Sequence, residues 1–380
     1  MPRCLGNNTL LPLLRKLSES LGEQQAKNEL RWLIEHTRKV IGDGINIHQH
    51  MTAQSTDHKA ARLWRDQPAR STDEIERDSE RLSSVQHAWL RQAIADRTER
   101  HKPLQYIIGE QQFGKTNIIV RPPVLIPRWE TEEWVLRLAE LINSHTDNVR
   151  DMRLQQGLGA PRPLNILEAC TGSGCVALGL GCELTDDSAR VLGVDISDDA
   201  LELAIDNLAY NQMLLSNHVQ FRKVDLQQPV HILPEQLQFV GEDMSDNWDM
   251  IVSNPPYVTP TEYHDLDADV REWEDIRALV PLPPGTTDPQ NVPSEDLDPS
   301  GMSFVVQLAK LAKELGLASK DRGEDESLRL DSLPRLVVEI GSTEQAQAAS
   351  QIMHDHGLNS TEVWKDMAGT DRVVLGYFKQ

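Results

Sequence analysis

WDMIVSNPPY, residues 248–257, combines a short apolar run with an abrupt stop. The run at 250–252 (Met-Ile-Val) has the composition of a strand that is covered on both faces. Pro255 and Pro256 have no N–H group, so the strand ends there. A carboxamide, two rigid prolines and an aromatic ring then stand at the carboxyl end of a strand, which is where open α/β sheets bind their ligands. The stretch therefore predicts an α/β sheet with a site at this strand end.

The side chains of this motif suit a planar amino group. The side-chain oxygen of Asn254 and the carbonyl of Pro255 are two acceptors at a fixed spacing, because the fixed φ of the next residue, Pro256, holds that carbonyl in place. Tyr257 adds a face on which a planar group can stack. We expect these residues to hold a primary amide or an exocyclic amine. The alternative is a plain Pro-Pro turn, with Asn254 as a turn residue and Tyr257 in the core.

Length and charge narrow the class of protein. The chain has 380 residues, enough for two domains, and its 39% of apolar residues permit a substantial core. Its formal net charge is -21, and no basic stripe is visible, which favours a small-molecule or protein substrate over naked nucleic acid. No apolar run is long enough to span a membrane. The four cysteines contain no CxxC pair, and no metal site is predicted.

The first part of the chain reads as a separate helical domain at 1–100. Leucines at 10, 13, 14 and 17 recur at helical spacing, while 42–82 is polar and reads as a loose helix pair. The first 18 residues contain basic but no acidic side chains, typical of a short organellar presequence or of a plain amphipathic helix. A β-hairpin linker is predicted at 101–130, with strands at 106–108 and 118–120.

From residue 131 onward, strands alternate with helices. Thr131 is expected to cap a helix, and polar inserts are expected near 143–163, 228–247, 281–300 and 317–333. Strands are predicted at 164–169, 191–195, 219–224, 249–253, 335–340, 361–365 and 372–378. This alternation predicts a doubly wound, Rossmann-like sheet of mostly parallel strands. The last two strands are joined too briefly for a crossover, so one of them is expected to pair antiparallel.

Three further strand ends carry candidate cofactor-binding residues. A glycine-rich turn follows the first strand and consists of Cys170, Thr171, Gly172, Ser173 and Gly174. Asp195 closes the second strand and is placed to accept a ribose diol. Asp225 and Leu226 follow the third strand, where an adenine ring can lie against them. Taken singly, each aspartate is equally well explained as a solvated acid at a strand end.

Together these residues resemble an S-adenosylmethionine-dependent methyltransferase, and more narrowly the HemK/PrmC family of protein-glutamine N5-methyltransferases. PLQYIIGEQQFG at 103–114 resembles the family's interdomain hairpin, VLIPRWETE at 124–132 the segment after it, and GTDRVVLGYF at 369–378 the closing hairpin. The resemblance covers the chain from about residue 101 to its end, with a helical domain before it, and implies a seven-stranded sheet.

The resemblance implies particular roles. The turn 170–174 would hold the methionine part of S-adenosylmethionine, Asp195 its ribose, and Asp225 with Leu226 its adenine, with Asn254 facing the cofactor as well. Asn254, Pro255, Pro256 and Tyr257 would hold the glutamine amide of the Gly-Gly-Gln loop in a class I peptide chain release factor. A monomer with no direct nucleic-acid contact is expected, in the mitochondrion or alternatively in the cytoplasm.

The sequence also departs from the family pattern. Cys170 replaces a usual glycine, Trp129 and Asp275 each replace a usual proline, Glu168 stands where aspartate is common, and Leu226 replaces a frequent aromatic residue. Two other functions stay open. One is an amino methyltransferase acting on adenine N6 in a nucleic acid, because the Asn-Pro-Pro-Tyr motif also serves such enzymes. The other is a cofactor-binding subunit without catalysis.

Overall fold

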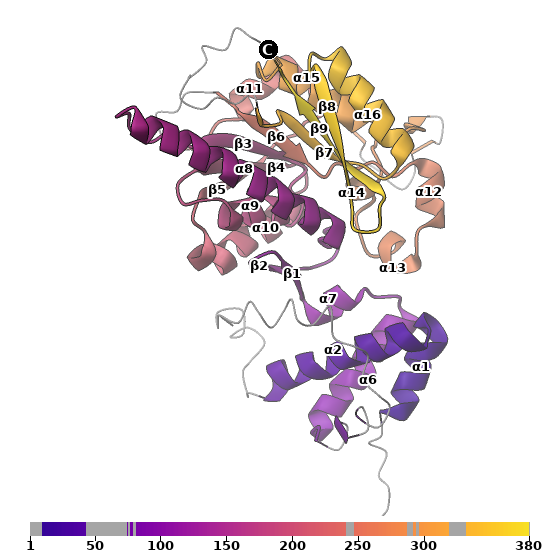
Figure 1. Cartoon of the computed structure of the whole chain (residues 1–380). Helices are drawn as coiled ribbons and strands as arrows, with labels where there is room; N and C mark the ends of the chain where they lie inside the picture. The colour runs from indigo at the N-terminus through magenta and orange to yellow at the C-terminus, as the bar shows by residue number, and fades with distance from the viewer. Residues whose placement is uncertain are drawn as a thin grey trace, which may run out of the picture. The chain divides into compact units, whose positions relative to one another are not determined.

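The computed structural model describes residues 10–42, 74, 77–78, 81–240, 247–286, 292–293, 296–318 and 332–379. These residues divide into two compact units, one formed by 1–110 with 268–273 and the other by 111–267 with 274–380 (Figure 1). The suggested presequence and the loose helix pair at 42–82 fall largely outside the described residues, as do parts of the inserts at 281–300 and 317–333. None of the described helices is both long and apolar enough to cross a membrane.

The first unit is helical. Its helices are α1 (Leu11–Leu21), α2 (Glu23–Gly42), α6 (Ser84–Glu99), α7 (Leu104–Ile108) and the short α13 (Ala268–Arg271). The predicted leucine stripe packs inward, with Leu10 and Leu17 fully buried against residues of α2 and α6. Ser83 begins α6 with a capping box, because its hydroxyl accepts from the Gln86 N–H while the Gln86 side chain accepts from the Ser83 N–H. Burial of the stripe thus holds this unit together.

The predicted strand at 106–108 is wrong, because these residues form the end of α7. Short apolar runs do not distinguish helix from strand, and here the buried Leu104 and Tyr106 are two residues apart, as in a strand, although the backbone is helical. Gly109 ends the helix in a left-handed conformation at φ 86°. The hairpin follows this point, as β1 (Glu110–Phe113) and β2 (Thr116–Ile119).

The second unit confirms the predicted fold class. Its strands are β3 (Leu164–Ala169), β4 (Ala189–Asp195), β5 (His218–Lys223), β6 (Met250–Ser253), β7 (Leu336–Glu339), β8 (Ser360–Lys365) and β9 (Asp371–Tyr377). They form one sheet in the order β5-β4-β3-β6-β7-β9-β8, in which the first five strands are parallel. As expected, a late strand is antiparallel: β9 runs against both of its neighbours.

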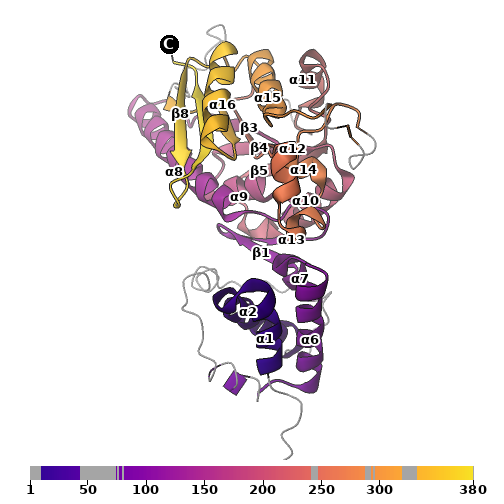
Figure 2. The same cartoon turned by 90° about the vertical axis from the view of Figure 1, so that its right-hand side faces the viewer.

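Helices cover both faces of this sheet (Figure 2). On one face lie α8 (Trp129–Gln155), α9 (Cys175–Glu183) and α10 (Asp198–Asn211). On the other lie α11 (Leu233–Gln236), α15 (Ser303–Glu314) and α16 (Thr343–Asp355), while α12 (Pro260–Asp265) and α14 (Ile276–Leu279) follow β6. Because both faces are covered, every residue of β6 is buried. Fully burying a side chain such as Ile251 contributes about 1.5–3 kcal/mol, so an Ile251→Asp change would break this strand.

Two expectations about α8 are wrong. The helix begins at Trp129 with Arg128 as its N-cap, so Thr131 lies inside the first turn and does not cap it. The helix also continues to Gln155, through most of the expected insert at 143–163, because Thr146 and Val149 bury one face of that stretch. The insert near 228–247 likewise supplies core material, since Leu233 and Leu237 join the main hydrophobic cluster.

Candidate active site

A cavity opens at the carboxyl ends of the central parallel strands of the second unit. The predicted residues that line it are Cys170, Gly172, Asp195, Asp225, Leu226, Asn254 and Pro256. Register explains their meeting, because Ala169 pairs with Val194 on one side and with Ser253 on the other, so β3, β4 and β6 end together. Among the described residues, the other five predicted ones, Thr171, Ser173, Gly174, Pro255 and Tyr257, are not part of this lining.

The turn after β3 needs unusual backbone angles. Cys170, Gly172 and Gly174 have φ values of 60°, 53° and 82°, in the left-handed region. A Cβ on Gly174 would lie 2.7 Å from the Phe221 ring, whereas a Cβ on Gly172 would meet nothing within 4 Å. Gly174 is therefore a packing glycine, and Gly172 leaves the backbone open toward the cavity. The φ of Cys170 explains why glycine is usual at that position.

A buried and a partly buried carboxyl group stabilise this turn. The Thr171 hydroxyl donates to Glu168, which is 1% exposed, and burial raises the pKa of Glu168 to about 8. Asp195 accepts from the Gly172 N–H at 2.9 Å through Oδ2 and from the Ser197 N–H at 2.9 Å through Oδ1. Burial also raises the pKa of Asp195. A carboxylate has about four lone-pair sites, so Asp195 can still accept hydroxyl groups from a ligand.

The third strand end is simpler. Asp225 accepts from the Gln227 N–H at 2.9 Å, which fixes the carboxylate at the cavity wall. Leu226 beside it is 4% exposed and belongs to the main hydrophobic cluster. Phe304 from α15 and Leu282 add apolar surface to the same cavity. Acidic groups beside an apolar wall suit a nucleoside, with its hydroxyls on one side and its flat base on the other.

In the motif at 254–257, which we call the acceptor side of the site, two oxygens accept no hydrogen bond within the described residues. Asn254 donates from Nδ2 to the Thr131 hydroxyl oxygen at 3.1 Å. Within the described part of the chain, no group donates a hydrogen bond to Asn254 Oδ1 or to the Pro255 carbonyl oxygen. Ser253 anchors the end of β6, because its hydroxyl donates to the Ala169 carbonyl at 2.8 Å. The motif is therefore fixed, and both oxygens keep unused acceptor capacity.

A group that the sequence reasoning missed lies behind this motif. Glu339 closes β7 and is 1% exposed. Its Oε2 accepts from the Thr131 hydroxyl at 2.7 Å and from Trp134 Nε1 at 2.7 Å, and its Oε1 accepts from the Tyr257 hydroxyl at 3.1 Å. Burial raises the pKa of Glu339, against the opposing effect of these hydrogen bonds. An acid at the end of an otherwise apolar strand was the available sequence signal.

Tyr257 makes several contacts within the second unit, while its predicted stacking role stays a prediction. Its hydroxyl is bonded to Glu339, and its carbonyl accepts from Gln345 Nε2 at 2.8 Å. A Cβ on Gly341 would lie 3.2 Å from the Tyr257 ring, so the ring packs closely on that glycine. These contacts hold Tyr257, and with it the end of the motif, in place.

The residues at 129 and 275, where the family pattern usually has proline, have local explanations. Trp129 is the first residue of α8, a position at which proline is favoured but not required. Asp275 is the N-cap of α14, and its carboxylate accepts from the Arg277 N–H at 2.9 Å. The same carboxylate pairs with the Arg277 guanidinium, and both residues line the cavity. Neither change removes a group from the acceptor side.

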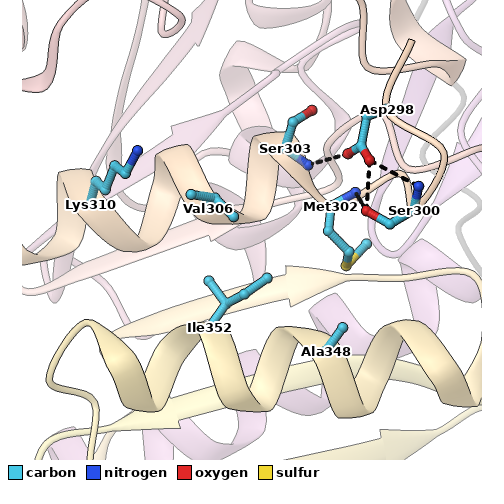
Figure 3. A pocket seen from close by; sticks show the side chains of 8 residues that line it. All are labelled: Asp298, Ser300, Met302, Ser303, Val306, Lys310, Ala348 and Ile352. Atoms are coloured by element: carbon cyan, nitrogen blue, oxygen red, sulfur yellow. Dashed lines mark hydrogen bonds between the residues drawn. The ribbon is translucent and has the colours of Figure 1, made fainter. Parts of the chain in front are cut away.

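A second hollow lies between α15 and α16 (Figure 3). Asp298 there accepts from the Ser303 N–H at 2.6 Å and from the Ser300 N–H at 2.9 Å, so its bonds serve the start of α15. Val306 and Ile352 supply apolar surface. None of the predicted site residues and no strand end contributes to this hollow, and we place the chemistry at the strand ends.

The strand order, the glycine-rich turn and the cavity at the strand ends define the class I S-adenosylmethionine-dependent methyltransferase fold. A release factor glutamine methyltransferase of Fusobacterium nucleatum is 30% identical over 286 residues, which are 75% of this chain and 63% of that protein. Its counterpart in Bacteroides thetaiotaomicron is 34% identical over 223 residues, 58% of this chain and 62% of that protein. The chain thus spans less than two thirds of either relative.

A fungal relative is similar over more of its length. The probable MRF1 mitochondrial N(5)-glutamine methyltransferase of Schizosaccharomyces pombe is 29% identical over 282 residues, 73% of this chain and 75% of that protein. The chain is thus similar to release factor glutamine methyltransferases over most of its length. No protein-family model matches it. Among solved structures, the hMettl16 catalytic domain with MAT2A 3'UTR hairpin 6 is 14% identical at a TM-score of 0.37, covering 78% of this chain and 83% of that one.

Proposed function

We propose that this protein transfers a methyl group from S-adenosylmethionine to the side-chain amide nitrogen (N5) of the glutamine in the Gly-Gly-Gln motif of a class I peptide chain release factor. The observation that carries the proposal is the pair of unused acceptors, Asn254 Oδ1 and the Pro255 carbonyl; Asn254 lines the cavity, and Pro255 lies in the chain between the lining residues Asn254 and Pro256. A primary amide has two N–H groups in one plane, and two fixed acceptors match them. The relatives named above are called glutamine methyltransferases, of a release factor in one case and of MRF1 at N(5) in the other.

The residues of the cavity fit the proposed cofactor. Gly172 leaves open space at the backbone, where the amino-acid part of the cofactor would lie. Asp195 retains acceptor capacity for ribose hydroxyls, and Asp225 with Leu226 would hold the adenine between a polar and an apolar contact. When bound, S-adenosylmethionine supplies an electrophilic methyl group on a sulfonium centre.

The protein would act by positioning and electrostatics. An amide nitrogen is a weak nucleophile, and fixing both of its N–H bonds through Asn254 and Pro255 orients the nitrogen; such orientation contributes up to about 7–11 kcal/mol in favourable systems. The same two oxygens would stabilise the positive charge that develops on the nitrogen more than they stabilise the neutral amide. The proton then leaves to water, and we assign no protein base.

The substrate protein and its location are part of the proposal. The net charge of -21 favours a basic protein surface as the partner over naked nucleic acid. We place the protein in the mitochondrion, in line with the names of the Schizosaccharomyces pombe relative and of the Saccharomyces cerevisiae protein MTQ1. Import of the tagged full chain into isolated mitochondria tests the location, and an entirely cytosolic distribution in cells would contradict it.

The substrate class can be tested with one assay. Purified protein with radiolabelled S-adenosylmethionine is offered a class I release factor, DNA and RNA in separate reactions. We expect label on the release factor alone. Label on DNA or RNA would instead establish an amino methyltransferase acting on a base. Tight cofactor binding without any transfer would indicate a non-catalytic subunit.

A further inference from the structure

The acceptor motif is connected to a buried chain of polar side chains. Asn254 Nδ2 lies 3.1 Å from Thr131 Oγ1, and Thr131 Oγ1 lies 2.7 Å from Glu339 Oε2. Trp134 Nε1 reaches the same Glu339 oxygen at 2.7 Å. Thr131, Trp134 and Glu339 are 1%, 3% and 1% exposed, so water has little access to compete for these bonds.

Trp134 and the charge state of Glu339 together set the direction of the bonds in this chain. An indole N–H can only donate, so Glu339 Oε2 presents a lone pair to it, and in the ionised carboxylate Oε2 has no proton to give to Thr131. Thr131, at 2.7 Å from that oxygen, must therefore donate its single hydroxyl proton to it. The Thr131 oxygen then offers only lone pairs to Asn254, and the group of Asn254 that can bond there is the –NH2.

We propose that Glu339, through Thr131, sets the amide orientation of Asn254, so that Oδ1 and not Nδ2 faces the substrate. The inference rests on the proposed function, because the orientation matters only for a substrate that donates N–H bonds. With the amide reversed, Asn254 would present an –NH2 group to the substrate –NH2, and two donors cannot bond. Glu339 and Thr131 are thus positioning residues for the reaction.

The direction of the bonds, and not the charge of Glu339, carries this role. A glutamine at 339 can place its amide oxygen where Oε2 lies, keep the bonds from Trp134 and Thr131, and donate its –NH2 to the Tyr257 oxygen. Leucine at 339 has similar volume but accepts nothing, which frees the Thr131 proton to turn toward Asn254 Oδ1. Glu339→Gln and Glu339→Leu therefore separate bond direction from charge.

Four variants test the proposal in the full-length protein with a release factor substrate. Thr131→Val removes the hydroxyl at nearly constant volume. We expect kcat to fall about 10- to 100-fold, because the Asn254 amide is then no longer held with Oδ1 toward the substrate. Thr131→Ser keeps the hydroxyl and is expected within about threefold of the unchanged protein. Glu339→Gln should stay within about fivefold, whereas Glu339→Leu should fall as far as Thr131→Val.

Two controls keep folding and binding apart from orientation. The affinity for S-adenosylhomocysteine, measured by calorimetry, should change less than about threefold in all four variants, since neither Thr131 nor Glu339 is itself part of the cavity lining. Thermal midpoints identify any variant that is unfolded at the assay temperature, in which case the Thr131 pair decides alone.

The outcomes separate this inference from the proposed function. An unchanged protein that does not methylate the release factor would overturn the proposed function, and the inference with it. Normal methylation by the unchanged protein together with a fully active Thr131→Val would overturn the inference alone. A Glu339→Gln variant as impaired as Thr131→Val would also overturn it, because charge would then be the essential property.

Discussion

The two halves of the site are held in different ways. On the cofactor side, Asp195 and Asp225 accept hydrogen bonds from backbone N–H groups, two of which lie only two residues further along the chain. On the acceptor side, Asn254 and Tyr257 are held by Thr131 and Glu339, which lie 123 and 82 residues away in sequence. The first half is built mainly from local turns, and the second from side chains that only the folded sheet brings together.

This difference predicts different consequences of substitution. Changes on the cofactor side should alter affinity for the cofactor, because those groups face the cavity directly. Changes on the acceptor side should alter turnover, because in the proposed function those groups orient the substrate amide. Four predictions test this division, in order of decreasing effect.

The largest effect is expected from Asn254→Ala. It removes one of the two substrate acceptors, and losing one such electrostatic contact typically costs about 10²–10³ in kcat. Cofactor affinity should stay within about threefold, as measured by calorimetry with S-adenosylhomocysteine. A variant with near-normal turnover would contradict the division between the two halves.

The next effect is expected from Asp195→Ala, with the opposite signature. The change removes the acceptor for ribose and the bond to the Gly172 N–H, so we expect the Kd for S-adenosylhomocysteine to rise about 10- to 100-fold. At saturating cofactor, kcat should fall far less than in Asn254→Ala. The matched control is Asp198→Asn, because Asp198 is exposed and pairs with Lys223 outside the cavity lining. Equal losses from both changes would show that Asp195 has no special role.

The third prediction concerns the buried carboxyl under the cofactor side. Burial raises the pKa of Glu168 from 4.5 to about 8, so the folded protein holds its proton more tightly than the unfolded chain does. Its contribution to stability is therefore present below about pH 4.5 and is lost as the pH rises to about 8. Glu168→Gln stays neutral and should not show this loss.

Thermal midpoints between pH 5 and 8.5 measure the difference directly. The unchanged protein should lose stability relative to Glu168→Gln as the pH rises. Parallel curves for the two proteins would mean that the pKa of Glu168 is the same in the folded and unfolded chains.

The smallest effect is expected from Cys170→Gly. Cys170 has a left-handed φ of 60°, which costs a residue with a Cβ about 1–2 kcal/mol. Glycine relieves that cost but loses about 0.4–1 kcal/mol through the freedom of the unfolded chain, so the net gain should be about 0.5–1 kcal/mol in urea unfolding. Cys170→Ala keeps the Cβ and should show no gain. A loss of stability in the glycine variant would contradict the assignment of strain.

The same division explains what the sequence could predict. The strands and their mostly parallel pairing follow from local patterns, and so does the place of the turn 170–174 directly after an apolar run. The network of Thr131, Trp134 and Glu339 could not be predicted, because its members come from α8 and β7, which meet only in the folded sheet. The sequence predicts Thr131 as a helix cap, because a hydroxyl near a helix start gives the same local pattern whether it caps the helix or bonds to a distant side chain.

Mass spectrometry tests the proposed transfer of a methyl group to a glutamine amide most directly. A recombinant class I release factor is incubated with the protein and S-adenosylmethionine, digested, and its Gly-Gly-Gln peptide is fragmented. We expect a gain of one methyl group on the glutamine side chain. This gain should be absent when the Asn254→Ala variant replaces the unchanged protein. An unmodified glutamine, from a protein that is shown separately to bind the cofactor, would contradict the proposed transfer.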